Sequence, residues 1–370
     1  MNNPLRYGLI GCGGFGRFCL QEYASMPELR LVAVADLDPK LAQATGDEFG
    51  LEVCASPEAL LARTDVDIVH IATPPFTHRP LALAAIAAGK HVLCEKPLAT
   101  DFADAEAMVA LSREKGRVLA VNLIMRYNPL CEVVKTIIER GYLGEPLHAH
   151  FVNDAKDEQL SPAHWFWDRE KSGGIFIEHG VHFFDLFEWW FGPGKVQSAQ
   201  QAQRPGSTII DQVNCTVLYP NAVLANFYHG FHQASRMDHQ EWKLVFEMGS
   251  ISMREWVPTG MRIDLLADDA TIEKLRQLLP GADVQETARY QGVERHCVSR
   301  HRPREVDGHF SITTTGGLPK MKLYGVMLRA LMWDQLATIR NPSHVRQITE
   351  ANGLTSLAMA VAAQRLADAT

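Results

Sequence analysis

The first third of the chain alternates short apolar runs with amphipathic stretches. The first run begins by about Leu5, and the others are rich in β-branched residues: Leu31–Ala35, Val66–Ala72, Lys90–Cys94 and Val118–Val121. Helical patterns separate some of them, over Pro80–Ala88 and Phe102–Lys115. Strands that alternate with helices form βαβ units and a mainly parallel sheet buried on both faces. The pattern predicts an α/β, doubly wound domain through about residue 122.

Beyond residue 123 the pattern changes to consecutive strands. The expected strands are Leu147–Asn153, Val213–Leu218, Val223–His232, Trp242–Met248, Ser250–Trp256 and Met261–Leu266. Helices are expected over Pro129–Arg140, Val181–Trp190, Leu323–Arg340 and Glu350–Ala367, with a shorter one near Thr271–Leu279 inside a loop-rich passage, 268–317. Strands without intervening helices favour an α+β domain on a mainly antiparallel sheet. We therefore expect two domains, a dinucleotide-binding domain over 1–123 and a substrate-binding and oligomerisation domain over 124–370.

Composition narrows the function. The net charge of −7 argues against a nucleic-acid or anionic-membrane partner. The seven cysteines form no C-x-x-C pair, which suits reduced thiols in the cytoplasm better than disulfides or a zinc site. The early first strand leaves no room for a signal peptide, and no apolar run is long enough to span a bilayer. A cytoplasmic protein is expected.

A glycine-rich motif directly follows the first apolar run. Gly11, Gly13 and Gly16 form a G-x-G-x-x-G pattern, which allows a tight turn, close approach of a pyrophosphate, and close packing of the next helix on the sheet. The following helix N-terminus offers N–H groups to phosphates. The second strand ends in Asp36, twenty positions after Gly16, where a carboxylate that binds the ribose is expected. The two features together predict a Rossmann dinucleotide site.

Two further segments carry candidate chemistry. Lys96 follows the strand ending at Cys94, and ligands of open α/β sheets bind outside the carboxyl ends of the strands. Glu178 and His182 are four apart and share one face of a regular helix, so they could form a carboxylate–imidazole acid/base pair. The plainer alternatives are a surface lysine and a buried structural histidine. The same spacing resembles a metal pair, but no third ligand is obvious, so no metal is expected.

In this order, the motifs resemble those of the glucose–fructose oxidoreductase/inositol dehydrogenase/MocA-type family of NAD(P)-dependent oxidoreductases. They are Gly11–Gly16, Asp36, Thr73-Pro74-Pro75 with His78, Glu95-Lys96-Pro97, Met125-Arg126-Tyr127-Asn128-Pro129, and Gly173-Gly174 leading to Glu178 and His182. The resemblance covers most of the chain. It implies a catalytic lysine at Lys96 and a catalytic histidine at His182, joined by a carboxylate at position 178. The family usually has aspartate there, whereas this chain has glutamate.

The resemblance also implies a reaction and its contacts. A secondary alcohol of a sugar, cyclitol or related polyol would be oxidised, or the ketone reduced, with His182, Lys96 or the neighbouring His179 as the base. Cofactor contacts are expected at Gly11, Cys12, Gly13, Gly14, Phe15, Gly16, Asp36, Leu37, Thr73, Pro74, Pro75, His78, Glu95, Lys96 and Asn122. Substrate contacts are expected at Arg126, Asn153, Asp154, Trp165 and His179.

Asp36 favours NAD over NADP, because its carboxylate would repel a 2′-phosphate and Leu37 supplies no cation, although Lys40 lies nearby. Two alternatives stay open: a catalytically silent dinucleotide-binding regulator, and a reductase of an unrelated carbonyl or imine. A homodimer or homotetramer is expected through the antiparallel sheet, where Phe227 and Phe231 share one face of a strand.

Overall fold

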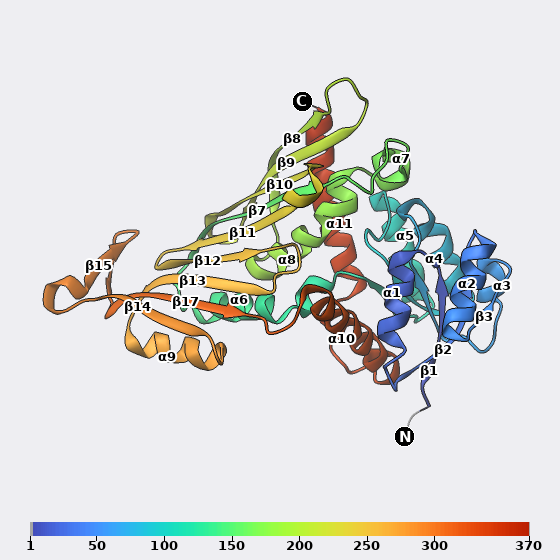
Figure 1. Cartoon of the computed structure of the whole chain (residues 1–370), viewed down its shortest axis with the longest axis horizontal. Coiled ribbons are helices and arrows are strands. Elements are labelled where there is room, and N and C mark those ends of the chain that lie inside the picture. Colours follow the sequence, from blue (N-terminus) through green and yellow to red (C-terminus); the bar gives the residue numbers. More distant parts are fainter. Residues whose placement is uncertain (1–2, 370) are drawn as a thin grey trace. The chain divides into compact units, whose positions relative to one another are not determined.

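The computed structural model describes residues 3–369, which divide into two compact units (Figure 1). Of the described residues, the first unit contains 3–124, 162–185 and 325–364, and the second contains 125–161, 186–324 and 365–369. The leading segment of the first unit ends at Ile124, and the boundary expected from the sequence follows residue 123. Two later segments of the chain also belong to this unit, which a division at a single point does not capture.

The first unit is built on a six-stranded parallel sheet in the order β3-β2-β1-β4-β5-β6. Its strands are β1 Leu5–Ile10, β2 Leu29–Ala35, β3 Glu52–Val53, β4 Ile68–Ile71, β5 His91–Cys94 and β6 Leu119–Val121. Its early helices are α1 Gly14–Tyr23, α2 Pro39–Phe49, α3 Pro57–Leu61, α4 His78–Ala87 and α5 Phe102–Glu114. The central strands β1 and β4 are almost fully buried, as expected for a parallel sheet. The predicted doubly wound domain is confirmed.

The later segments of the first unit pack against this early part. They contain α7 Arg169–Ser172, a π-helical turn over Phe176–Gly180 that continues into α8 Val181–Phe191, and most of α10 Lys320–Arg340 and α11 Glu350–Asp368. Gly353 of α11 lies so close to Val121 and Leu98 that a Cβ there would contact both side chains. Arg329 of α10 pairs with Glu22 of α1. These contacts hold the C-terminal helices to the Rossmann sheet.

The second unit is built on a nine-stranded mixed sheet in the order β14-β17-β13-β12-β11-β7-β10-β9-β8 (Figure 1). Its elements are α6 Pro129–Arg140, β7 Pro146–Lys156, β8 Lys195–Gln203, β9 Ile210–Tyr219, β10 Val223–Gln233, β11 His239–Phe246, β12 Gly249–Arg254, β13 Gly260–Ala267, α9 Asp269–Leu278, β14 Asp283–Arg289 and β17 Gly308–Thr315, with a separate hairpin of β15 His296–Ser299 and β16 Arg302–Glu305. Among the described strands of the sheet, only β7 and β10 pair in parallel. The expected mainly antiparallel α+β domain is confirmed.

One expectation about this sheet is wrong. Phe227 and Phe231 do not form an exposed patch, since their side chains are 1% and 8% exposed. The ring of Phe227 lies 4.7 Å from that of Phe187 in the second half of α8, so this face of β10 is the core face. The outward positions of the central strands carry polar side chains such as His148, Asn226 and Lys243. Alternation along the strand identified one face as apolar but could not say that a helix of the same chain covers it.

The passage 268–317 contains more structure than expected. After α9, strands β14 and β17 extend the sheet beyond β13, and the hairpin β15–β16 lies between them in sequence. The edge strands β8 and β14 were missed because edge strands bury few side chains and carry polar residues; Ala199 is the one buried residue of β8.

Candidate active site

The glycine loop between β1 and α1 has the shape that a pyrophosphate needs. Gly11 has a φ of 102°, and a Cβ there would collide with the Ala72 carbonyl, whereas one on Gly16 would collide with the Gly11 carbonyl. A Cβ on Gly13 or Gly14 would meet nothing within 4 Å. Gly11 and Gly16 are therefore required by the packing of the protein itself, whereas open space lies beside Gly13 and Gly14. No side chain caps α1, which leaves its first N–H groups for an anion.

Asp36 at the end of β2 lies beside this loop. Its carboxylate accepts hydrogen bonds from the Cys12 N–H at 2.7 Å and the Asp38 N–H at 2.8 Å. These bonds hold the carboxylate in place next to the glycine turn. Leu37 is 87% exposed and brings no charge to the site. The residues around the loop therefore fit the dinucleotide that the sequence predicts.

The loops after β4 and β5 are joined by His78. Its ring nitrogens lie 2.7 Å from the Pro97 carbonyl oxygen and 2.8 Å from the Thr73 carbonyl oxygen, and the side chain is fully buried. Burial lowers the pKa of this imidazole below its usual value. A neutral imidazole carries one N–H, so His78 donates to one of these two carbonyls and packs against the other. Its ring lies between the two loops that carry Thr73–Pro75 and Glu95–Pro97, and its expected contact with the cofactor stays a prediction.

Lys96 and Glu178 form a close ion pair. The Lys96 ammonium donates to the Glu178 carboxylate at 2.5 Å and to the Glu178 backbone carbonyl at 2.9 Å. The side chains are 19% and 12% exposed. The lysine at the carboxyl end of the sheet is thus fixed to the segment that leads into α8, and its charge is compensated locally.

His182 lies in the first turn of α8 and is 5% exposed. Burial and the positive charge of Lys96 hold its pKa well below the usual histidine value. The imidazole is therefore neutral near pH 7 and able to accept a proton.

The partner of Glu178 differs from the expected one. The sequence predicted that its carboxylate pairs with His182, and the structure pairs it with Lys96. The prediction assumed regular α-helical spacing, but residues 176–180 form a π-helical turn, which alters the side-chain directions along the segment. Turns of this kind occur often at functional sites.

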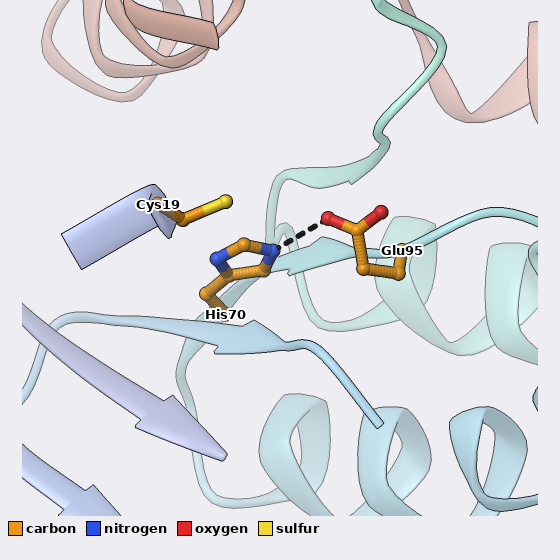
Figure 2. A group of neighbouring side chains, drawn as sticks. All are labelled: Cys19, His70 and Glu95. Carbon is orange, nitrogen blue, oxygen red and sulfur yellow. Dashed lines mark hydrogen bonds and ion pairs between the residues drawn. The ribbon is translucent and has the colours of Figure 1, made fainter. Parts of the chain in front are cut away.

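A buried hydrogen-bond chain lies behind Glu95, and sequence reasoning missed most of it. The Glu95 carboxylate is 2.9 Å from His70 Nε2, and His70 Nδ1 is 2.8 Å from the Tyr7 hydroxyl (Figure 2 shows Glu95 and His70). Asn122, expected as a cofactor contact, donates to the same carboxylate at 2.8 Å. A polar residue in the middle of the apolar strand Ile68–Ile71 was the signal that could have revealed His70.

The expected substrate contacts fall in both units. Trp165 and His179 belong to the first unit, where the His179 ring lies 5.1 Å from that of Phe183. In the second unit the Arg126 guanidinium lies 5.7 Å from the Trp189 ring centre, and Asn153 donates to the Gly230 carbonyl at 3.1 Å. Asp154 lies 3.8 Å from His232, whose ring is 2.8 Å from the Tyr228 hydroxyl. His232 and Tyr228 of β10 therefore lie beside Asp154 of β7, and the sequence did not predict these two residues.

Two stretches of the chain match family models. Residues 5–123 match the oxidoreductase family with an NAD-binding Rossmann fold, and residues 132–252 match the GFO/IDH/MocA C-terminal domain. The chain is 35% identical over 264 residues to a dTDP-3,4-didehydro-2,6-dideoxy-alpha-D-glucose 3-reductase of Saccharopolyspora spinosa, which covers 69% of this chain and 78% of that protein.

Other similarities are shorter or limited to the fold. A 2,7-anhydro-N-acetylneuraminate hydratase of Mediterraneibacter gnavus is 31% identical over 186 residues, 50% of this chain and 49% of that protein. Matches of this kind span about half the length of the curated relatives. A solved levoglucosan dehydrogenase in complex with NADH and L-sorbose aligns over 100% of this chain and 98% of its own, with a TM-score of 0.78 and 21% identity. That likeness concerns the fold.

Proposed function

Because the chain belongs to the GFO/IDH/MocA oxidoreductase family with an NAD-binding Rossmann domain, we propose that it transfers a hydride between NAD and a secondary alcohol or ketone of a sugar, cyclitol or related polyol. The observation that carries the proposal is the position of Lys96 and His182. Lys96 follows β5 at the carboxyl end of the parallel sheet, and the pKa of His182 is lowered by burial and by the charge of Lys96. A cation and a neutral base in mutual electrostatic contact are the groups that alcohol oxidation requires.

The proposed reaction assigns separate roles to the cofactor-binding and the catalytic residues. Gly13, Gly14 and the start of α1 would hold the pyrophosphate, and Asp36 the adenosine ribose. Bound NAD supplies the acceptor for the hydride that leaves the carbinol carbon. His182 accepts the hydroxyl proton, and the Lys96 ammonium donates a hydrogen bond to the same oxygen as it becomes a carbonyl. In the reductive direction the same groups act in reverse, with His182 as the proton donor. Glu178 orients Lys96 through the 2.5 Å ion pair.

A substrate panel tests this proposal. Purified protein is incubated with NAD⁺ and a series of sugars and cyclitols, or with NADH and keto-sugars, and absorbance at the NADH band is followed. We expect turnover of at least one polyol. The reductase name of the Saccharopolyspora spinosa relative is the reason for including keto-sugars. Tight cofactor binding without turnover of any compound would favour the catalytically silent regulator, and turnover of an unrelated carbonyl or imine would favour the third alternative.

The cofactor preference follows from Asp36. Both of its oxygens already accept backbone N–H bonds, so the carboxylate stays in place and repels a 2′-phosphate. We expect NADH to bind more tightly than NADPH in a fluorescence titration. Asp36→Ser should reduce the difference between the dissociation constants of the two cofactors. Tighter binding of NADPH by the unmodified protein would contradict this assignment.

We also propose a homodimer or homotetramer formed through the outer face of the sheet. Leu224 and Leu218 are register partners on β10 and β9 and are 41% and 40% exposed, so they form an apolar pair on the side away from α8. Light scattering should give a mass above the monomer's at micromolar concentration, and Leu224→Glu should lower it. A monomer in the unmodified protein would contradict the proposal.

We place the dinucleotide-binding domain at residues 1–123 and the substrate-binding and oligomerisation domain at 124–370, with the later segments 162–185 and 325–364 folded onto the first. We place the protein in the cytoplasm, which its seven free cysteines support. In the described part of the chain, none of the helices has both the length and the apolar character to cross a membrane.

A further inference from the structure

Four polar residues are linked in a row across the Rossmann sheet. Tyr7 lies on β1, His70 on β4, Glu95 at the end of β5 and Asn122 at the end of β6, and these four strands are neighbours in this order. The links are 2.8 Å from the Tyr7 hydroxyl to His70 Nδ1, 2.9 Å from His70 Nε2 to Glu95 Oε1, and 2.8 Å from Asn122 Nδ2 to Glu95 Oε1. All four side chains are buried, and Glu95 is 8% exposed.

The direction of each hydrogen bond can be assigned. Burial raises the pKa of Tyr7 well above its usual value, so its hydroxyl keeps its proton, and we assign that proton to the hydrogen bond with His70 Nδ1. A neutral imidazole that accepts at Nδ1 carries its proton on Nε2, and therefore donates to Glu95. The Asn122 amide is also a donor. Glu95 Oε1 thus accepts two hydrogen bonds, which is the pattern that stabilises a carboxylate anion.

A metal site is the alternative for the same residues. Cys19, His70 and Glu95 bring one ligand atom each within 4.8 Å of the others (Figure 2). However, both nitrogens of His70 already lie in hydrogen bonds. A metal would have to displace one of them, so these contacts favour the hydrogen-bond chain.

The charges around Glu95 leave a net negative charge. Lys96 is the adjacent cation, but its ammonium is paired with Glu178 at 2.5 Å. The pKa of His182 lies well below its usual value, and the hydrogen bond that His70 Nδ1 accepts from Tyr7 leaves one N–H on that ring, so neither ring adds a positive charge. The group of Lys96, Glu178 and Glu95 therefore carries one uncompensated negative charge. It lies at the carboxyl end of β5, the edge where ligands of open parallel sheets bind.

We propose that the chain Tyr7–His70–Glu95–Asn122 holds this charge in place so that the protein binds oxidised cofactor more tightly, relative to reduced cofactor, than it otherwise would. The oxidised nicotinamide ring is positively charged and the reduced ring is neutral, so an anion near the ring discriminates between them. In this assignment Glu95 sets the electrostatic preference, and His70 and Tyr7 are positioning residues. The inference rests on the proposed NAD-dependent function.

The test compares the dissociation constants of NAD⁺ and NADH, measured without substrate by calorimetry and by fluorescence. For Glu95→Gln we expect the ratio Kd(NAD⁺)/Kd(NADH) to rise about tenfold, the scale of one charge interacting across several ångströms of partly buried protein. A tenfold change corresponds to about 30 mV in the potential of the bound two-electron couple. For His70→Leu we expect a rise in the same direction, and for Tyr7→Phe a smaller one.

Two variants serve as controls. His70→Gln keeps an N–H donor toward Glu95 and should leave the ratio near that of the unmodified protein, which separates the hydrogen bond from the loss of a buried ring. Glu106→Gln removes an exposed carboxylate from α5 of the same unit and should leave the ratio unchanged. Circular dichroism and thermal unfolding show whether each variant is folded.

The outcomes separate this inference from the proposed function. If Glu95→Gln and His70→Leu weaken both cofactor forms equally, the chain is only structural and the inference is overturned, while NAD binding stands. If the unmodified protein binds neither form, the proposed function itself fails. A stoichiometric metal in the purified protein that is lost in Cys19→Ser would also overturn the inference in favour of the metal site.

Discussion

Lys96 and His182 are the residues whose replacement should separate catalysis from binding. Lys96→Met or His182→Asn should lower kcat by about 100-fold or more, the usual scale for a lost general acid or base. Both groups are assigned to the reacting oxygen, so the Kd of NADH should change little. Stopped-flow kinetics and fluorescence titration measure the two quantities.

Lys115→Met is the matched control, because this lysine pairs with Glu114 at the end of α5 and is 46% exposed. It should leave kcat unchanged. A Lys96→Met protein with full activity would contradict the assignment of this site as the active site of an enzyme. A His182→Asn protein with full activity would show that Lys96 or His179, and not His182, is the base.

Glu178 should control the pH dependence through Lys96. The Lys96 charge lowers the pKa of His182, and the Glu178 carboxylate compensates that charge at 2.5 Å. Glu178→Gln leaves the positive charge uncompensated, so the pKa of His182 should fall further. Because oxidation needs a neutral imidazole, the acidic limb of the pH–rate profile should move to lower pH, with a smaller loss of kcat than in Lys96→Met.

Lys96→Met should move the same limb in the opposite direction, since the cation that lowers the pKa of His182 is removed. Residual activity measured across pH gives both shifts. Equal shifts of the same sign in the two variants would contradict the electrostatic coupling between Lys96 and His182.

At the scale of elements, the glycine loop offers a pair of variants that separate binding from stability. Gly13→Ala adds a methyl group that meets nothing in the protein, whereas Gly16→Ala adds one that collides with the Gly11 carbonyl. Gly13→Ala should therefore keep the melting temperature and weaken NAD binding at least tenfold. Gly16→Ala should lower the free energy of unfolding by about 1–3 kcal/mol, as overpacking does.

Thermal unfolding without cofactor and titration with NADH test this pair. A Gly13→Ala protein that binds NADH as tightly as the unmodified one would show that the pyrophosphate does not approach this loop. A stable Gly16→Ala protein would show that α1 can shift away from the sheet.

At the scale of the whole molecule, buried histidines make stability depend on pH. His91 accepts a hydrogen bond from the Val118 N–H at 3.0 Å, and burial lowers its pKa from 6.5 to about 4. Between these values the unfolded chain binds a proton that the folded protein does not. Stability is therefore full above pH 6.5 and falls as the pH drops toward 4, by about 3 kcal/mol for this group.

His229 acts in the same direction, because burial lowers its pKa to about 3. Urea denaturation at a series of pH values measures the slope, and His91→Gln should flatten it between pH 6.5 and 4. An unchanged slope in that variant would show that His91 takes up its proton at the same pH in the folded and unfolded states.

The elements and the nucleotide motif could be read from the sequence. The helix Pro129–Arg140 has its predicted bounds because Asn128 caps the Leu130 N–H at 2.9 Å, Pro129 occupies the first turn, and Gly141 ends it with a φ of 64°. These signals are local, so they act before any tertiary contact forms. The turn at Gly11 and Gly16 and the position of Asp36 at the end of the second strand are likewise local signals. Strands β8 and β14 were not predicted from the sequence, because an edge strand needs few apolar side chains.

By itself the sequence determined the two-part α/β and α+β organisation, the glycine loop and the family, because these depend on periodicity, turn chemistry and the order of motifs. Only the tertiary structure decided which groups meet. It joined Glu178 to Lys96 instead of His182, turned Phe227 toward α8, and aligned Tyr7, His70, Glu95 and Asn122 across four strands. Such contacts join residues 25 to 82 positions apart in the chain. A local sequence pattern does not determine which polar atoms form hydrogen bonds with each other in the interior, where water is excluded.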